Sequence, residues 1–224
     1  MRVILIGKGR FGKILFEKLR HLADVEIATR KYKEKLAGKD WAVVATPVAT
    51  HSGIVKDCLN AGLNVFSEKP LSENPKEIEE IFALAKERNK RIYVDDVFMW
   101  REEFRRIWAL KLQPQKISLR MAKYGTFNDS LLAVHVYHDL YIVSSLTNCA
   151  PVSDLKILKR ASPLEADRTD VLEFSFKAGD TIVEGSYDRT QDVKQKTITI
   201  DDRIVWSNDA LTIDGKPQNL PAHD

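Results

Sequence analysis

Cysteine and long apolar runs are both scarce in this sequence of 224 residues. The two cysteines, Cys58 and Cys149, are too few for a disulfide framework and lack the spacing of metal ligands. No apolar run approaches the roughly 20 residues that span a bilayer. The N-terminal apolar run over residues 3–6 is too short for a signal peptide, and no small-residue cleavage site follows it. The sequence therefore predicts a cytoplasmic protein without a metal site.

An excess of charge of one sign is also missing. The chain has 35 Lys and Arg against 32 Asp and Glu, a formal net charge of +3. A nucleic-acid binder needs a clustered basic surface to contact phosphates, so this balance argues against one. With 44% hydrophobic and 30% charged residues, the composition is that of a globular protein, which excludes disordered and fibrous classes. At roughly 150 residues per domain, the length allows one large domain or two compact ones.

The first hundred residues alternate short β-branched runs with helical periodicity. Strands are predicted over residues 2–6, 25–29, 41–45, 64–67 and 91–94. The first predicted helix carries an apolar stripe of Phe11, Ile14, Leu15, Leu19 and Leu22. Strand–helix alternation of this kind predicts right-handed βαβ units and a parallel sheet.

After about residue 100 the pattern changes. Helical stretches are predicted near residues 102–110 and 131–146. Alternating strands are predicted over residues 171–177, 181–188, 196–201 and 204–206, and residues 215–224 read as a polar tail. A run of strands after a run of βα units predicts a second, α+β domain with a mainly antiparallel sheet.

A glycine motif lies between the first strand and the first helix: Gly7, Gly9 and Gly12, with Arg10 and Phe11 inside it. Gly7 permits the tight turn, Gly9 lets the backbone approach a pyrophosphate, and Gly12 lets the helix pack against the strand. The free N–H groups of the helix N-terminus favour the diphosphate. The motif predicts a Rossmann-type, doubly wound dinucleotide-binding domain over residues 1–98, followed by a smaller α+β domain over residues 99–224. The alternative is a glycine turn without a ligand.

The end of the second strand is basic, where an NAD-binding domain carries Asp or Glu for the ribose 2′-hydroxyl. Thr29, Arg30 and Lys31 occupy this turn, and Lys33 lies close by. A cation there would pair with the additional phosphate of NADP. We therefore predict that NADP is preferred over NAD. The alternative is an exposed basic turn with no such role.

Two further motifs follow the third and fourth strands, at the edge where open α/β sheets bind their ligands. They are Ala45-Thr46-Pro47-Val48-Ala49-Thr50-His51 and Glu68-Lys69-Pro70. Together with the glycine motif they resemble the glucose–fructose oxidoreductase/inositol dehydrogenase/MocA (Gfo/Idh/MocA) family over nearly all of residues 1–100. The resemblance implies a two-domain NAD(P)-dependent oxidoreductase acting mainly on sugars, cyclitols or sugar nucleotides. It also implies a homodimer or homotetramer that forms through the open sheet of the second domain.

The same resemblance implies roles for individual residues. Cofactor contacts would fall on Ala45, Thr46, Pro47, His51 and Glu68, and Lys69 would lie beside the nicotinamide and the substrate hydroxyl. A buried ammonium at this position lowers the pKa of that hydroxyl and stabilises developing alkoxide charge. The alternative interpretation of Glu68 and Lys69 is a surface ion pair.

In the second domain, His138 and Asp139 resemble the histidine-containing helix of the family. An imidazole suits the catalytic task of accepting the hydroxyl proton near neutral pH. The family commonly has an aspartate four residues before this histidine, and here that position holds Val134. His135 shares a helix face with His138 at α-helical spacing and could substitute for the missing group. The alternatives are that the substrate is held differently or that catalysis is weak. Asp139 should point elsewhere.

The expected reaction is hydride transfer between the nicotinamide and a secondary alcohol carbon of a sugar, cyclitol or sugar derivative. Asp95 and Asp96, after the fifth strand, are further candidates for binding substrate hydroxyls. Two other classes of function remain open. One is a non-catalytic dinucleotide-binding sensor or scaffold, which Val134 favours, and the other is a redox-assisted lyase or hydrolase.

Overall fold

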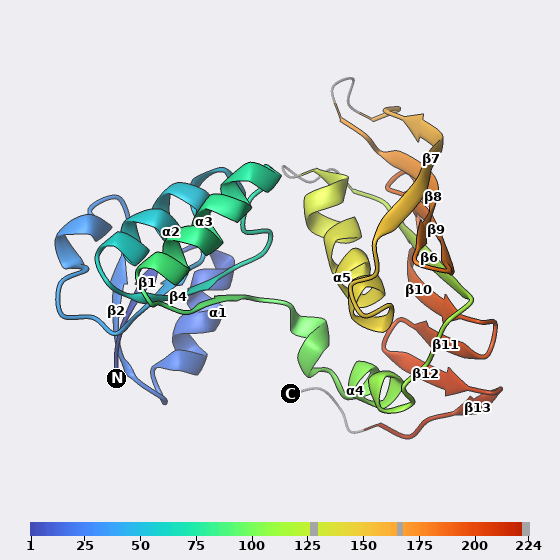
Figure 1. The fold of residues 1–224 in the computed structure, drawn as a ribbon, viewed down its shortest axis with the longest axis horizontal. Coiled ribbons are helices and arrows are strands. Elements are labelled where there is room, and N and C mark those ends of the chain that lie inside the picture. The colour runs from blue at the N-terminus through green and yellow to red at the C-terminus, as the bar shows by residue number, and fades with distance from the viewer. Residues whose placement is uncertain (126–129, 165–167, 221–224) are drawn as a thin grey trace. The chain divides into compact units, whose positions relative to one another are not determined.

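The computed structural model describes residues 1–125, 130–164 and 168–220. The chain divides into two compact units, Met1–Asp96 and Val97–Asp224, which Figure 1 shows as ribbons. The second unit has more residues than the first, although the sequence suggested a smaller second domain.

The first unit is a five-stranded parallel sheet in the order β2-β1-β3-β4-β5, with helices on both faces. Its strands are β1 (Arg2–Ile6), β2 (Asp24–Ala28), β3 (Trp41–Val44), β4 (Asn64–Ser67) and β5 (Ile92–Val94). Its helices are α1 (Arg10–Leu19), α2 (His51–Asn60) and α3 (Pro75–Glu87), with 3-10 turns η1 (Tyr32–Lys35) and η2 (Val48–Thr50). The predicted doubly wound, Rossmann-type sheet is therefore confirmed.

The strand β1 shows why this unit folds with two helical layers. Its alternate residues face opposite sides of the sheet: Ile4 and Ile6 pack under α2 and α3, and Val3 and Leu5 pack under α1. Such strands are buried on both faces, which explains their continuous apolar sequence.

The face that α1 presents to the sheet differs from the predicted stripe. It consists of Gly12, Leu15, Phe16 and Leu19, spaced as one side of a helix. Phe11, Ile14 and Leu22, which the sequence placed on the buried face, are exposed. The reason is the buried Gly12, which draws its own side of the helix close to the sheet.

The second unit is an eight-stranded sheet in the order β13-β12-β11-β10-β6-β9-β8-β7, in which only β6 and β9 pair parallel among the described strands. Its strands are β6 (Lys116–Lys123), β7 (Val152–Ala161), β8 (Val171–Ala178), β9 (Thr181–Asp188), β10 (Lys194–Ile200), β11 (Ile204–Ser207), β12 (Ala210–Ile213) and β13 (Lys216–Pro217). Its helical segments are η3 (Val97–Trp100), α4 (Glu102–Ala109), the π-helix η4 (Leu132–Val136) and α5 (Tyr137–Leu146). The helices α4 and α5 lie on one side of the sheet (Figure 1), and their apolar side chains share one core with it. The mainly antiparallel second sheet is confirmed, and β13 occupies part of the predicted polar tail.

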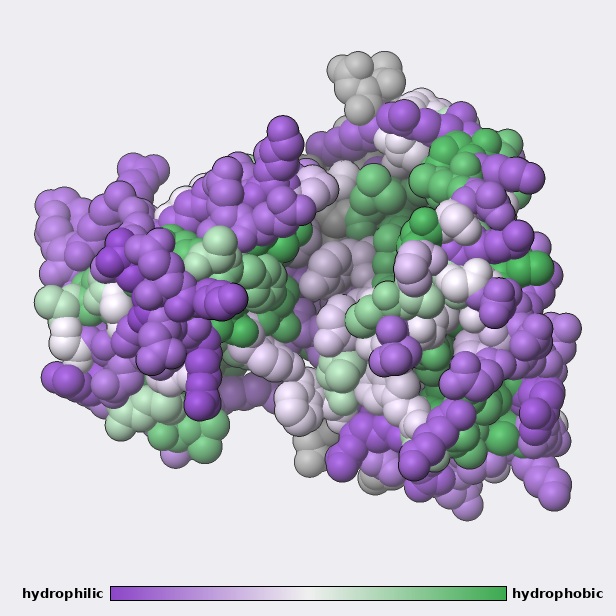
Figure 2. Space-filling model, viewed as in Figure 1, coloured by the Kyte–Doolittle hydropathy of each residue, from purple (hydrophilic) through white to green (hydrophobic). Residues whose placement is uncertain are grey.

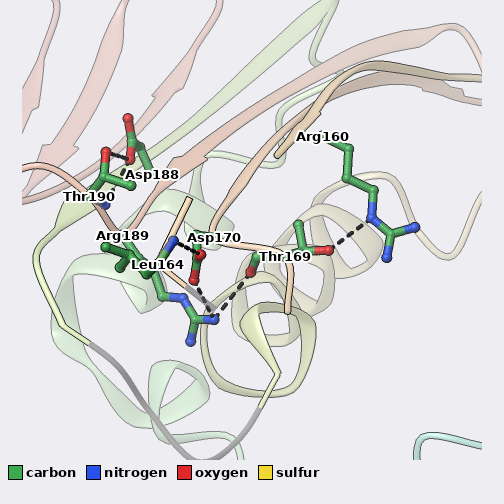
Figure 3. A network of polar contacts seen from close by, with 7 residues as sticks. All are labelled: Arg160, Leu164, Thr169, Asp170, Asp188, Arg189 and Thr190. Carbon is green, nitrogen blue, oxygen red and sulfur yellow. Dashed lines mark hydrogen bonds and ion pairs between the residues drawn. The ribbon is translucent and has the colours of Figure 1, made fainter. Parts of the chain in front are cut away.

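A buried ion pair joins the start of β8 to the end of β9 in this unit (Figure 3). Arg189 donates from Nη2 to Oδ1 of Asp170 at 3.3 Å and to the carbonyl oxygen of Thr169 at 3.1 Å. The other carboxylate oxygen of Asp170 accepts the N–H of Leu164 at 2.9 Å. Both charged side chains are almost fully buried, and a buried charge is tolerated only when it is paired in this way. The pair therefore closes the open end of the β8–β9 hairpin, opposite the turn between Ala178 and Thr181.

Candidate functional site

The glycine turn after β1 is shaped by crowding of the backbone. Gly7 has a φ of +118°, and a Cβ on it would lie 2.2 Å from the carbonyl oxygen of Ala45. A Cβ on Gly12 would lie 2.3 Å from the carbonyl oxygen of Gly7. Neither position accepts a side chain, so both glycines are required by the fold itself. The loops after β1 and β3 thus touch at Gly7 and Ala45.

Gly9 differs from the other two glycines because nothing in the protein occupies the space in front of it. It caps α1 with a φ of −67°, which other residues adopt readily, and a Cβ on it would meet no atom within 4 Å. The first turn of α1 contains no acidic residue, so the positive end of the helix dipole is not neutralised there. An open approach to the free N–H groups of a helix N-terminus fits a dinucleotide diphosphate. Arg10 and Phe11 are exposed beside it.

The basic turn after β2 borders a surface hollow of about 340 Å³, lined by Lys8, Ile27, Ala28, Thr29, Arg30, Lys31 and Lys35. Two nearby cations are already neutralised. Lys33 pairs with Asp57 at 2.8 Å, and Lys35 pairs at 2.8 Å with Glu26. The two lysines Lys35 and Lys39 lower the pKa of Glu26 to about 2.

The remaining cations of this hollow are different. Lys8, Arg30 and Lys31 make no ion pair with any residue that the structure describes. All three are exposed. Their charges are therefore available to an anionic ligand.

His51 connects the loops after β3 and β4. Its ring is buried, with Nδ1 2.8 Å from the carbonyl oxygen of Pro70 and Nε2 2.7 Å from that of Thr46. Thr50 donates from its hydroxyl to Oγ1 of Thr46 at 2.8 Å and to the carbonyl oxygen of Pro47 at 2.7 Å. The sequence interpretation made His51 a cofactor contact. In the structure its buried ring bridges the carbonyl oxygens of Thr46 and Pro70.

Carboxylates gather around Lys69 at the ends of β4 and β5. Burial raises the pKa of Glu68 to about 6, and the charge of Asp95 adds to this effect while Lys69 opposes it. Burial, then the charge of Asp96, raises the pKa of Asp95, again against the effect of Lys69. The N–H of Asp95 donates to the carbonyl oxygen of Ser67 at 2.8 Å, which fixes the two strand ends to each other. Perturbed carboxylates around a half-buried ammonium are typical of a functional site.

His138 lies in α5 of the second unit, directly after the π-helix η4. The N–H of Tyr137 donates to the carbonyl oxygen of Leu132, five residues back, as in a π-helix. Residues are spaced differently around the axis of a π-helix, so the expectation that His135 and His138 share one face, which assumed α-helical spacing, does not carry over. The ring of His138 packs edge-to-face on Phe98, with 5.1 Å between the ring centroids. The side chain of Val134 lies outside what the structure describes.

Asp139, the residue after His138, contacts the sheet of the same unit. It is fully buried, accepts a hydrogen bond from the Tyr187 hydroxyl at 2.8 Å and pairs with Lys196 at 2.6 Å. Sequence reasoning missed Tyr187, Lys196 and Phe98. The available signal was the period-2 alternation, which places Tyr187 on the strand face of buried Val183 and Lys196 on that of buried Ile198.

A comparison with family models shows what the sequence of the first unit is similar to. Residues 16–96 match the model of the GFO_IDH_MocA oxidoreductase family, described as an NAD-binding Rossmann fold. This segment of the chain is similar to the Gfo/Idh/MocA family. The match includes the loops that carry Thr46, His51 and Lys69, and it begins after the glycine turn. The first unit thus contains a segment, residues 16–96, that is similar to the NAD-binding Rossmann domain of Gfo/Idh/MocA oxidoreductases.

Solved structures share the whole fold at low sequence identity. UDP-N-acetylglucosamine 3-dehydrogenase GnnA from Acidithiobacillus ferrooxidans has a TM-score of 0.90 and 17% identity, covering 100% of this chain and 84% of that one. A Gfo/Idh/MocA family oxidoreductase from Vibrio cholerae has a TM-score of 0.79 and 18% identity, covering 100% of this chain and 82% of that one. GenD2 from gentamicin A biosynthesis, solved in complex with NAD, has a TM-score of 0.78 and 19% identity, covering 95% of this chain and 71% of that one. At such identity these likenesses show a shared fold alone.

No curated protein matches the sequence. Within residues 1–125, 130–164 and 168–220, no helix has the length and apolar character needed to cross a membrane. In the same residues, no group of three or more His, Cys, Asp or Glu side chains could hold a metal ion.

Proposed function

We propose that this protein is a dehydrogenase that uses NAD(P) to oxidise a secondary alcohol of a sugar, cyclitol or sugar derivative, or to reduce the corresponding ketone. The observation that carries the proposal is the edge of the first sheet. There, contacts of Gly7 with Ala45, of His51 with Thr46 and Pro70, and of Asp95 with Ser67 link the loops of four strands. Linked loops at the carboxyl ends of parallel strands can hold a dinucleotide and a substrate in one fixed geometry. When bound, the nicotinamide supplies the hydride acceptor or donor.

Lys69 has the role of holding the substrate oxygen. Its ammonium favours the alkoxide form of a nearby hydroxyl, because a positive charge in a partly water-excluded site stabilises developing negative charge. The raised pKa values of Glu68 and Asp95 indicate that this region is shielded from water. Substrates with an anionic group at the reacting carbon would meet Asp95 and Asp96 there. A neutral polyol or sugar ring is the substrate class that this charge pattern favours.

His138 has the role of proton acceptor for the substrate hydroxyl. It is half-buried, so its imidazole is shielded and still accessible to a ligand. With Val134 in the place of the family aspartate, the orientation of the ring must come from other contacts, of which Phe98 is one. His135 is the alternative acceptor, and it is also half-buried.

The cofactor is proposed to be NADP in preference to NAD. Arg30, Lys31 and Lys8 line the hollow after β2 without ion-pair partners among the described residues, and no carboxylate lines this hollow to accept a ribose 2′-hydroxyl. An arginine can bind a phosphate with two parallel hydrogen bonds.

Self-association through the second sheet is also proposed, as a homodimer or homotetramer. The edge strand β7 exposes Val152, Leu155, Ile157 and Leu158, each more than half accessible, and Figure 2 shows apolar side chains on the surface over the β7 end of the sheet. Exposed apolar edge strands are normally covered. A clean monomer in light scattering at micromolar concentration would contradict this proposal.

Fluorescence titration with NADPH and with NADH at one fixed salt concentration tests the cofactor site. Replacing Arg30 by Ala should weaken NADPH binding about 10- to 100-fold, since a charge-assisted hydrogen bond contributes about 1.5–3 kcal/mol. NADH binding should not change. Lys33→Ala is the matched control, because it removes the same charge from the same turn but Lys33 is already paired with Asp57. Tighter binding of NADH by the wild type would discard the 2′-phosphate argument.

A substrate screen with NADP and NAD then tests the reaction, using UDP-N-acetylglucosamine, UDP-glucose, glucose and myo-inositol as probes. Lys69→Ala should reduce turnover by about 100-fold or more with little change in thermal stability. Unchanged turnover in that variant would refute the mechanism. Tight cofactor binding without turnover on any probe would instead identify a sensor or scaffold. Cofactor that remains bound after purification, with no net NAD(P)H formed during turnover, would identify a redox-assisted lyase or hydrolase.

A further inference from the structure

A buried carboxylate lies directly beside the proposed proton acceptor. Asp139 follows His138 in α5 and is fully buried against the sheet. The hydroxyl of Tyr187, in β9, donates to its Oδ2 at 2.8 Å, and the ammonium of Lys196, in β10, lies 2.6 Å from its Oδ1. The start of α5 is therefore attached through one side chain to β9 and β10, the two strands that flank β6.

The charge of Asp139 requires this attachment. An unpaired carboxylate in a protein core is strongly destabilising, whereas one with a cation and a hydroxyl donor is tolerated. Burial and the charge of Asp139 raise the pKa of Tyr187 well above its usual range, so its hydroxyl stays protonated and keeps donating. Lys196 is about one-fifth exposed, so its ammonium is held largely by protein atoms.

Lys196 also contacts the ring that supports His138. Its ammonium lies 4.7 Å from the centroid of the Phe98 ring, within the range of a cation–π interaction. The same ring packs edge-to-face on His138, with the two planes inclined at 71°. Lys196 thus touches both the residue that follows His138 and the ring that packs on it.

The other contacts of Phe98 prevent the ring from moving aside. Phe104 and Trp206 pack edge-to-face on it, with centroids 5.2 and 5.7 Å away. The guanidinium of Arg101 lies 5.7 Å from its centroid and is paired at 2.6 Å with Glu103, which is fully buried. A ring surrounded in this way is a rigid wall for an imidazole.

We propose that Lys196 is a positioning residue that holds the imidazole of His138 in its working orientation, through Asp139 on one side and Phe98 on the other. The inference rests on the proposed function, in which His138 accepts the substrate proton. It gives this chain a source of orientation for the histidine that does not require an aspartate at position 134. A small misplacement of a catalytic group can reduce turnover about 100-fold.

The test removes the ion pair without leaving a buried charge. Lys196→Met alone would strand the Asp139 carboxylate and could unfold the chain, so the variant to examine is Lys196→Met combined with Asp139→Asn. On the best probe of the substrate screen, kcat should fall about 10- to 100-fold while KM changes little. The single variant Lys196→Arg, which keeps a cation beside Asp139, should retain most of the wild-type activity. The matched control is Lys116→Met with Glu184→Gln, which removes a lysine–carboxylate pair of 2.8 Å from the exposed side of the same sheet.

A double-mutant cycle separates positioning from general damage. If Lys196 acts through His138, the paired substitution should cost nothing further in a His138→Gln background, because groups that act as a unit are not additive. Equal losses in both backgrounds would overturn the inference. Undiminished turnover in His138→Gln alone would instead refute the proposed role of His138.

A measurement without substrate keeps the two failures distinguishable. The ring signals of His138 in a proton–carbon NMR spectrum can be assigned by their loss in His138→Gln. They should move in the Lys196→Met/Asp139→Asn variant and stay in place in the Lys116/Glu184 control. The signals of His21 and His51, in the first unit, should not change in either variant. Unmoved His138 signals in the Lys196→Met/Asp139→Asn variant would overturn the inference whatever the activity.

Discussion

Gly9 offers the sharpest test of the cofactor site, because the structure separates its role from that of the other motif glycines. Replacing Gly9 by Ala adds one methyl group that touches no protein atom within 4 Å, at a backbone conformation open to alanine. The loss at a helix N-cap is below about 1 kcal/mol. In a chain of this length that corresponds to a shift in Tm of about 2–4 °C at most. The variant should therefore fold.

Binding is where this variant should fail. The added methyl group stands in front of the free N–H groups at the start of α1, where the diphosphate is proposed to lie. Displacing the diphosphate from one charge-assisted N–H contact costs about 1.5–3 kcal/mol, which is about a 10- to 100-fold rise in Kd. Because this contact is common to both cofactors, NADPH and NADH should be affected equally, as fluorescence titration would measure.

Two other glycines are the controls for this experiment. Gly53, inside α2, also has open space at its Cβ, so Gly53→Ala should leave Kd unchanged and stabilise the helix by up to about 1 kcal/mol. Gly7→Ala would put a Cβ 2.2 Å from a carbonyl oxygen and should prevent normal folding. An unchanged Kd in a folded Gly9→Ala variant would refute the argument that Gly9 is reserved for the ligand.

Three further predictions concern stability. Burial raises the pKa of Glu68 from 4.5 to about 6, so this side chain lowers the stability of the folded wild type as pH rises through that range. In urea unfolding at pH 7, Glu68→Gln should therefore be more stable than the wild type by up to about 1 kcal/mol, after allowance for solvent screening. At pH 4 the same substitution should give no gain. An equal gain at both pH values would exclude ionisation as the cause. His51→Ala removes the ring between two backbone carbonyls and should cost about 1–3 kcal/mol, measured by the same method. A Cβ on Gly185 would lie 2.3 Å from the ring of Phe174, so Gly185→Ala should lower the free energy of unfolding by about 1–3 kcal/mol. This loss should be smaller in a Phe174→Leu background. An equal loss in both backgrounds would show that the clash with Phe174 is not its cause.

The first unit was predictable because its signals are local. Each of its strands is a short apolar run bounded by turns, and the structure places the ends of the five predicted strands within one residue of the expected positions. The glycine motif also depends on neighbours in sequence. The helix stripe was less accurate, since the orientation of α1 depends on Gly12, whose close approach to the backbone of Gly7 cannot be seen from apolar periodicity.

The second unit was harder to predict: the sequence interpretation contained no strand for β6, β7, β12 or β13, and the first two of these show why. In β6, buried Ile117, Leu119 and Met121 alternate with more polar residues, a period-2 pattern that the sequence interpretation did not use. The edge strand β7 is exposed along nearly its whole length, so it has no buried face to produce an alternation. It also contains a register shift near Asp154, whose φ is +55°. An edge strand with such an irregularity has no reliable pattern in a single sequence.

The candidate site also combines residues that a local sequence motif identifies with contacts between residues far apart in the chain. Thr46, His51, Glu68 and Lys69 lie in motifs that a reader of the sequence can find, although the bridge from His51 to Pro70 is visible only in the structure. The contacts around His138 join residues far apart in the chain: Phe98 precedes it by 40 residues, and Lys196 follows it by 58. No local pattern connects such positions.

This division bears on position 134, where the sequence departs from the pattern of the family that it resembles. Val134 suggested weakened catalysis because the sequence shows only what stands one helical turn before His138. The structure shows that the helix is attached on its sheet side by Asp139 and that the imidazole packs on a ring enclosed by aromatic and cationic groups. Orientation of a proton acceptor needs rigid contacts, and these contacts can come from any direction around the ring. A valine at position 134 is therefore compatible with a working dehydrogenase when the sheet supplies what the helix lacks.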